Sequence, residues 1–264
     1  MKKTNKLLGL ILVFLITLCS CTNENVDPAQ IQFLKKIVEV SIDGTSNTTV
    51  LTYDGNKIVN IDELDKVSEF YYTGDLITKI IESDKTNQHV NTLQYSYSDG
   101  RLIKIISSDN YILNYIHNID GSVSYEKLTK NSNNNDVKIY HGILYFQSGN
   151  LVKDHRFLDD AGNDVLAENI VSFEYDHKNN ALYQVLGYNK LLDYSKTISL
   201  NNAISSSKIS SVKHIDDNQV VSSINTYKSK IQYNSNGYPT EIVSENTIFG
   251  ENDSNHLKSQ LYYN

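Results

Sequence analysis

The chain has 264 residues and a formal net charge of −7, from 24 basic and 31 acidic side chains. An acidic chain is poorly suited to binding nucleic acid, because affinity for phosphates comes mainly from lysine and arginine. For the same reason it is poorly suited to lying flat on anionic lipid. The 19 tyrosines, with no tryptophan, favour half-buried β-strands.

Residues 1–20 have the form of a bacterial lipoprotein signal peptide. Three lysines in the first six residues precede an apolar run over residues 7–18, and small residues follow it. As a helix, that run would reach about 18 Å, whereas the hydrocarbon core of a bilayer is about 30 Å thick. We therefore expect residues 1–20 to be removed as a signal rather than to span the membrane, and residues 21–32 to form a polar tether.

Cys21 is the predicted site of lipid attachment. Cleavage before Cys21 leaves the small Ser20 at the end of the signal, whereas cleavage before Cys19 would leave the bulky Leu18. The Leu-x-Ser-Cys sequence resembles a bacterial lipobox, which implies a cysteine that carries three acyl chains; secretion without lipid is the alternative. Because two membrane signals already anchor a protein stably, three chains on Cys21 would attach it permanently.

Hairpins with a glycine turn recur through the rest of the chain. In residues 93–97 apolar and polar side chains alternate, an Asp-Gly turn follows at residues 98–100, and residues 101–105 form the return strand. Alternation of this kind indicates a strand with one buried face, and Asp-Gly between two such strands is a strong hairpin signal. Similar units lie at residues 51–59, 70–80, 144–153 and 231–242.

Residues 181–193 interrupt this pattern. An asparagine pair before them can cap a helix, and Leu182 and Val185 fall on one helical face. We therefore predict one short helix near residues 181–193, inserted between strands. A serine- and asparagine-rich run at residues 201–211 is predicted to be a loop or the start of the next strand, with strands resuming near Lys213.

An antiparallel meander with one apolar face must curl or acquire a second layer to bury that face. We therefore predict a single all-β domain over residues 33–264, formed by an antiparallel meander curled into a strongly curved sheet or incomplete barrel. A Greek-key sandwich is the alternative. A transmembrane barrel would need apolar stripes facing lipid, whereas polar side chains occupy the outward positions of these strands.

The recurring unit of an aromatic pair, a polar turn with glycine and a Leu-x-Lys-Ile strand resembles the YD or RHS-type hairpin repeat. Together with the lipobox, it also resembles a group of Gram-negative lipoproteins classed as a domain of unknown function with a porin-like fold. Residues 173–180, with Gly187 downstream, carry this likeness most specifically. The resemblance covers about residues 33–263 and implies a curved antiparallel sheet, but no activity and no functional residues.

The sequence contains no recognisable catalytic or metal-binding motif. The seven histidines lack metal-ligand spacing, and His155 lies among charged residues at a predicted strand end. Residues 159–164 resemble a calcium loop but lack its closing glutamate. We therefore predict no enzyme activity, no cofactor and no metal site.

These observations predict a lipid-anchored cell-envelope protein of the outer membrane with a non-catalytic binding or structural role. Its expected partners are the membrane, through the lipid on Cys21, and a protein or glycan. One alternative is a carrier or binder of an apolar or glycan ligand in the curved sheet, and another is a hydrolase with a noncontiguous site. The tyrosines of the hairpin units either pack in the core or line a binding groove.

Overall fold

The structure, a computed structural model, describes residues 31–159, 162, 164–193, 197–216, 219–248 and 255–264. The predicted signal peptide, the lipid-attachment residue Cys21 and residues 21–30 of the predicted tether lie outside these ranges. Among the described residues, there is no helix with the length and apolar character needed to cross a bilayer.

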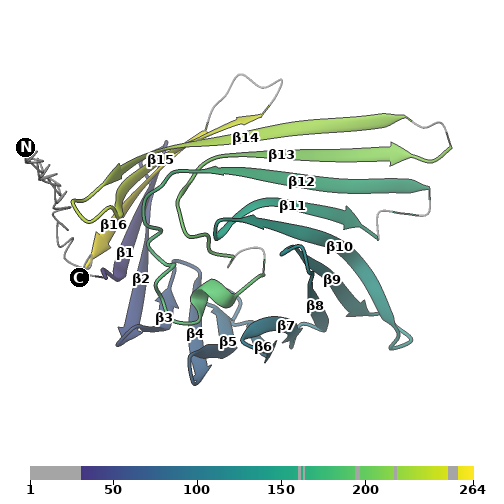
Figure 1. Ribbon diagram of the computed structural model, residues 1–264, viewed down its shortest axis with the longest axis horizontal. Coiled ribbons are helices and arrows are strands. Elements are labelled where there is room, and N and C mark those ends of the chain that lie inside the picture. Colours follow the sequence, from purple (N-terminus) through teal and green to yellow (C-terminus); the bar gives the residue numbers. More distant parts are fainter. Residues whose placement is uncertain (1–30, 160–161, 163, 194–196, 217–218, 249–254) are drawn as a thin grey trace, which may run out of the picture. The chain divides into compact units, whose positions relative to one another are not determined.

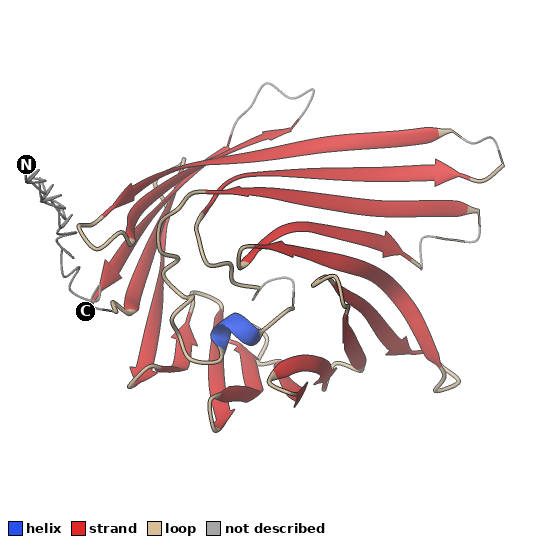
Figure 2. Cartoon of the chain, viewed as in Figure 1, coloured by secondary structure: helices blue, strands red, loops and turns tan. Residues whose placement is uncertain are grey.

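The described residues form sixteen strands in sequence order (Figures 1 and 2). The first nine are β1 (Leu34–Ser41), β2 (Ser46–Asp54), β3 (Lys57–Asp62), β4 (Lys66–Thr73), β5 (Leu76–Asp84), β6 (Val90–Ser98), β7 (Arg101–Ser107), β8 (Tyr111–His117) and β9 (Val123–Lys130). The other seven are β10 (Asp136–Gln147), β11 (Asn150–Leu158), β12 (Val165–Tyr175), β13 (Ala203–His214), β14 (Val220–Tyr233), β15 (Pro239–Ile248) and β16 (Asn255–Tyr263).

These strands form a closed antiparallel barrel. Each strand pairs with its neighbours in sequence, and β1 pairs with β16 to close the barrel, with Ile37 opposite Leu261. The predicted all-β antiparallel meander is therefore confirmed, and its curvature continues to full closure. Closure removes both edges of the sheet that the described strands form.

The predicted Asp-Gly hairpin has the expected geometry. Asp99 and Gly100 both have positive φ, at 50° and 71°, as the two central residues of a type I′ turn require. In β6 the register shifts between Ser96 and Tyr97, which marks a β-bulge beside the turn. The same shift occurs before the corresponding aromatic of four other hairpins, at Tyr53, Tyr72, Phe146 and Tyr233. A bulge bends its strand and increases its twist, so the repeated unit also supplies curvature.

Side chains bridge neighbouring hairpins where their strands separate near the turns. Backbone pairing between β5 and β6 ends at Lys79 and Gln94, short of Ile77. There the Tyr97 hydroxyl donates to the carbonyl oxygen of Ile77 at 2.7 Å. Three further side chains make equivalent hydrogen bonds to a backbone carbonyl oxygen close after a turn. They are His117 to Leu102, Tyr175 to Leu151 and Tyr263 to Pro239. Tyrosine therefore serves here as a hydrogen-bond donor to backbone as well as a packing residue.

The predicted helix near residues 181–193 is wrong in type and extent. The segment consists of turns with one 3₁₀ turn, η1 (Tyr188–Lys190), which Figure 2 shows in blue. Gly187 precedes it in the left-handed region, at φ 72°, and a Cβ there would lie 2.7 Å from the carbonyl oxygen of Asp75. The Leu186 amide donates to the carbonyl oxygen of Asn56 instead of to an α-helical partner. Contacts with the barrel wall thus replace helix formation.

The segment between β12 and β13 packs inside the barrel. Its residues Ala181, Val185, Tyr188 and Leu191 are buried in one cluster with inward side chains of the surrounding strands. The next strand, β13, begins at Ala203. The interpretation of residues 201–211 as the start of a strand is therefore confirmed. The prediction that strands resume only near Lys213 is wrong. The inserted segment therefore supplies the apolar filling that a wide barrel otherwise lacks.

Substitution of Tyr97 by Phe tests the bridging bonds. Tyr97→Phe removes the donor to the Ile77 carbonyl without removing the ring, so the free energy of unfolding should fall by about 1–3 kcal/mol. Tyr227→Phe is the matched control, because Tyr227 is 40% exposed, and its change should stay within about 0.5 kcal/mol. Urea unfolding measures the free energy of unfolding of both variants. Equal, small changes in the two would show that the hydrogen bond of Tyr97 contributes nothing to stability.

Candidate functional site

Asp154 on β11 is the residue at which the interior cavities meet. Its side chain is 2% exposed and lines a cavity of about 280 Å³ and a second cavity of about 120 Å³. The larger cavity extends from Asp154 toward Leu151, and the smaller toward Arg156. Ligand pockets start at about 300 Å³, so the larger cavity suits a small molecule or one part of a larger one.

A triangle of hydrogen bonds surrounds the Asp154 carboxylate. One carboxylate oxygen accepts the Tyr125 hydroxyl, and the other accepts Arg156 Nη2 at 3.2 Å. Arg156 Nε in turn donates to the Tyr125 hydroxyl oxygen at 3.0 Å. The guanidinium also lies 4.4 Å from the centre of the Tyr140 ring. Paired and hydrogen-bonded in this way, the two opposite charges can stay inside the barrel.

Gly142 makes this triangle possible. Tyr125 is on β9 and Asp154 is on β11, so the Tyr125 ring must cross β10, which carries Gly142 opposite Tyr125. A Cβ at Gly142 would lie 2.6 Å from the Tyr125 hydroxyl oxygen and 2.4 Å from the His155 carbonyl oxygen. The position therefore needs glycine for close approach rather than for an unusual backbone angle.

The buried setting changes how Asp154 titrates. Burial raises the pKa of the Asp154 carboxyl above its ordinary value of 3.8, an effect larger than the opposing influence of the Tyr125 hydroxyl and of Arg156. Burial likewise raises the pKa of the Tyr125 hydroxyl well above its usual value. Tyr125 therefore remains a protonated donor to Asp154 at neutral pH.

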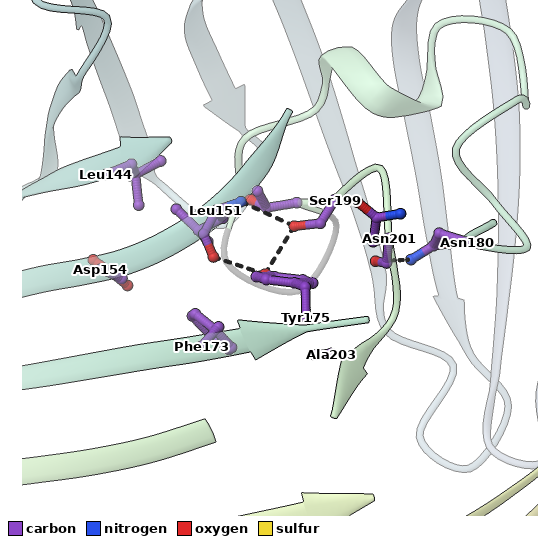
Figure 3. A pocket seen from close by; sticks show the side chains of 10 residues that line it. Leu144, Leu151, Asp154, Phe173, Tyr175, Asn180, Ser199, Asn201 and Ala203 are labelled. Atoms are coloured by element: carbon purple, nitrogen blue, oxygen red, sulfur yellow. Dashed lines mark hydrogen bonds between the residues drawn. The ribbon is translucent and has the colours of Figure 1, made fainter. Parts of the chain in front are cut away.

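The larger cavity lies between the barrel wall and the inserted segment (Figure 3). A second set of bonds holds its edge: the Tyr175 hydroxyl donates to the Leu151 carbonyl at 2.7 Å, and Ser199 Oγ donates to that hydroxyl at 2.9 Å. The Leu151 amide donates to Ser199 Oγ at 3.0 Å. The lining residues are Leu144, Leu151, Asp154, Phe173, Tyr175, Asn180, Thr197, Ser199, Asn201 and Ala203.

The smaller cavity carries more charge. Arg156 and Lys208 line it together with Asp154, Asn169 and Val171. Lys127 lies farther round the same inner wall, and its ammonium group is 3.9 Å from the centre of the Tyr111 ring. Cations and tyrosines thus alternate along this part of the barrel interior.

The charged cluster around His155 that the sequence indicates is divided between the two faces of β11. His155 alternates with the inward Asp154 and Arg156, so it faces outward, where it bonds Glu168 at 2.7 Å and packs on Phe157 with a ring separation of 4.3 Å. Residues 160, 161 and 163 of the candidate calcium loop lie outside the described residues. In the described part of the chain, no three His, Cys, Asp or Glu side chains are grouped as metal ligands.

The sequence singles out Asp154 and Arg156 only as charged neighbours of His155, and it gives no sign of Tyr125 or Lys208. The available signal was Asp154 and Arg156 at alternate positions of one strand, which places both on the same face. Their partners come from β9 and β13, so only the pairing registers bring this site together.

Comparisons with known proteins show the fold of the chain. No family model matches it, and no curated protein matches it. The chain is similar to the crystal structure of a porin-like protein from Bacteroides vulgatus, with a TM-score of 0.56 and 13% identity over 88% of this chain and 99% of that one. A porin-like protein from Bacteroides uniformis matches at 9% identity with a TM-score of 0.33, over 88% of this chain and 96% of that one. The barrel therefore has a porin-like fold.

The raised pKa of Asp154 predicts a defined pH dependence. Its stabilising contribution is fully present below the unfolded pKa near 3.8 and is lost as pH rises through the folded pKa. The free energy of unfolding of the wild type, relative to that of Asp154→Asn, should therefore fall as the pH rises above about 4 and through the raised pKa of Asp154. Urea unfolding at a series of pH values measures this difference.

Asp43→Asn is the control for this series. Hydrogen bonds from Thr45 lower the pKa of the exposed Asp43 carboxyl. Its contribution is therefore present above the unfolded pKa and lost as pH falls, which is the opposite direction. A wild-type advantage over Asp154→Asn that grows with pH would contradict the raised pKa of Asp154.

Proposed function

We propose that the chain is a lipid-anchored protein of the bacterial outer membrane whose barrel interior binds a small molecule without transforming it. The observation that carries this proposal is the cavity beside Asp154, between the wall and the inserted segment. The porin-like fold supports an envelope location.

The amino-terminal sequence supports attachment by lipid. Residues 1–20 have the charge, apolar length and small-residue end of a signal, and Cys21 stands where a lipobox cysteine is expected. The following polar residues would hold the barrel at a distance from the bilayer surface. In this proposal the acyl chains, and not the barrel, enter the membrane.

One row of outward side chains supports this division of roles. The pairing registers of the nine strands β6–β14 place one outward side chain from each strand in a single row. Most side chains of this row are polar or charged. A lysine or arginine facing lipid at the bilayer midplane costs about 2–4 kcal/mol in an outer-membrane barrel. The row consists of Ser96, Lys104, Asn114, Glu126, His141, Phe157, Glu168, Ser211 and Ser222.

The composition of the cavities supports binding over catalysis. Asp154 is the one carboxylate among the described residues that line the two cavities, and it is already bonded to Tyr125 and Arg156. Glycoside hydrolysis by the common mechanisms uses two carboxyl groups on either side of the bond. Recovery of shortened glycans after incubation with the protein would favour the hydrolase alternative.

A carrier of apolar or glycan ligands is the second candidate. Leu144, Leu151 and Phe173 give the larger cavity an apolar side. That side suits an aliphatic chain or the apolar face of a sugar ring. Both ligand types fit a non-catalytic envelope protein, so this candidate differs from the first only in what the cavity holds.

Substitution of Cys21 tests the anchor. In a bacterium that processes lipoproteins, the wild-type chain should fractionate with membranes and begin at an acylated Cys21, because three acyl chains give effectively permanent attachment. Cys21→Ser should leave the membrane fraction or keep its signal, whereas Cys19→Ser should behave as the wild type. Mass spectrometry of the mature amino terminus, with fractionation, measures both. A mature chain that starts elsewhere, or an unmodified Cys21, would contradict the anchor.

A further inference from the structure

Two cations share the smaller cavity beside Asp154. Arg156 on β11 is opposite Asn169 on β12, and Val171 of the same strand is opposite Lys208 on β13. Only β12 separates the two cationic strands, so their backbones are about 10 Å apart. Both long side chains line the same space of about 120 Å³.

The negative charge present offsets only part of this positive charge. The Asp154 carboxylate bonds Arg156 at 3.2 Å, and it is the one carboxylate among the described residues that line this cavity. Among the described residues, no carboxylate lies within 4.0 Å of the Lys208 or Lys127 ammonium group. Asp193 also faces the interior, where its carboxylate accepts the Tyr95 hydroxyl at 3.2 Å.

Lys127 extends the positive surface beyond Arg156. The Tyr140 ring lies between them, with its centre 4.4 Å from the Arg156 guanidinium and 5.9 Å from the Lys127 ammonium. Burial and the positive charge of Arg156 both lower the pKa of Lys127. An anion bound nearby would relieve this repulsion, because it would attract all three cations.

We propose that the smaller cavity binds the anionic group, a carboxylate or a phosphate, of a small organic molecule. Arg156 and Lys208 would contact the anion, and Lys127 would attract it from farther along the wall. This inference deepens the proposed function, because it assigns a ligand chemistry to the same interior site. The body of the ligand would extend past Asp154 toward Phe173 and Tyr175 in the larger cavity.

The donors around the cavity fit an anion better than a cation or a purely apolar molecule. A guanidinium and an ammonium form short, charge-assisted bonds to carboxylate and phosphate oxygens. Asn169 adds amide hydrogens, since its side-chain oxygen already accepts the Ser210 hydroxyl at 2.6 Å. An apolar ligand would exclude water from Lys208 without replacing that hydration, which is unfavourable.

NMR titration of the full-length mature protein tests the proposal with four probes: inorganic phosphate, acetate, glucuronate and glucose. Phosphate, acetate or glucuronate should shift the Asn169 side-chain amide and Arg156 signals saturably, whereas glucose, which has the sugar ring without the charge, should bind at least tenfold more weakly. Lys208→Gln removes one charge-assisted contact and should weaken anion binding about tenfold or more. Lys213→Gln, on the opposite face of β13, is the matched control and should leave the affinity unchanged.

Each result decides between the alternatives. A preference for phosphate over both carboxylates identifies a phosphorylated ligand, and the reverse identifies a carboxylated one. Equal binding of glucuronate and glucose, or anion binding that Lys208→Gln leaves intact, overturns the anion site but not the proposed binding role. The absence of saturable shifts with every anion also overturns the inference. Unchanged amide signals outside the cavity confirm that Lys208→Gln is folded.

Discussion

Backbone carbonyl groups at the separated ends of the hairpins are the constraint on which this barrel depends. The bulges beside the turns of five hairpins bend their strands and help to curve the sheet, but the same twist separates neighbouring hairpins. A buried carbonyl without a donor costs about 1–3 kcal/mol. A side-chain donor from the next hairpin satisfies such a carbonyl, as the Tyr97 hydroxyl does for the carbonyl oxygen of Ile77. The same role explains the positions of Tyr175 and Tyr263.

Closure of the barrel creates a second requirement, because sixteen strands enclose more space than their own side chains fill. The segment between β12 and β13 fills one part of that space with Val185, Tyr188 and Leu191. Where this filling ends, Asp154, Arg156 and Tyr125 bond one another, and the cavities begin. The candidate binding site is therefore the boundary between the apolar and the polar parts of one interior.

Local features of this structure could be predicted from sequence, and long-range ones could not. Asp99 and Gly100 specify their turn by themselves, because the required positive φ depends on residue type. The pairing of β1 with β16 and the approach of Tyr125 to Asp154 depend on registers far apart in the chain. The helix prediction failed for the same reason, since Gly187 fits against Asp75 in the distant turn between β4 and β5. Periodicity indicates which face is apolar, but not what will cover it.

Hydrogen exchange at single-residue resolution shows whether the barrel is closed and filled by its inserted segment. In a closed and filled barrel, the amides of Ile37, Val185 and Leu261 exchange as slowly as those of the other strands, since closure and burial protect them from all but large openings. Fast exchange of Ile37 and Leu261 would show an open sheet with two edges. Fast exchange of Val185 alone would show that the segment does not fill the barrel.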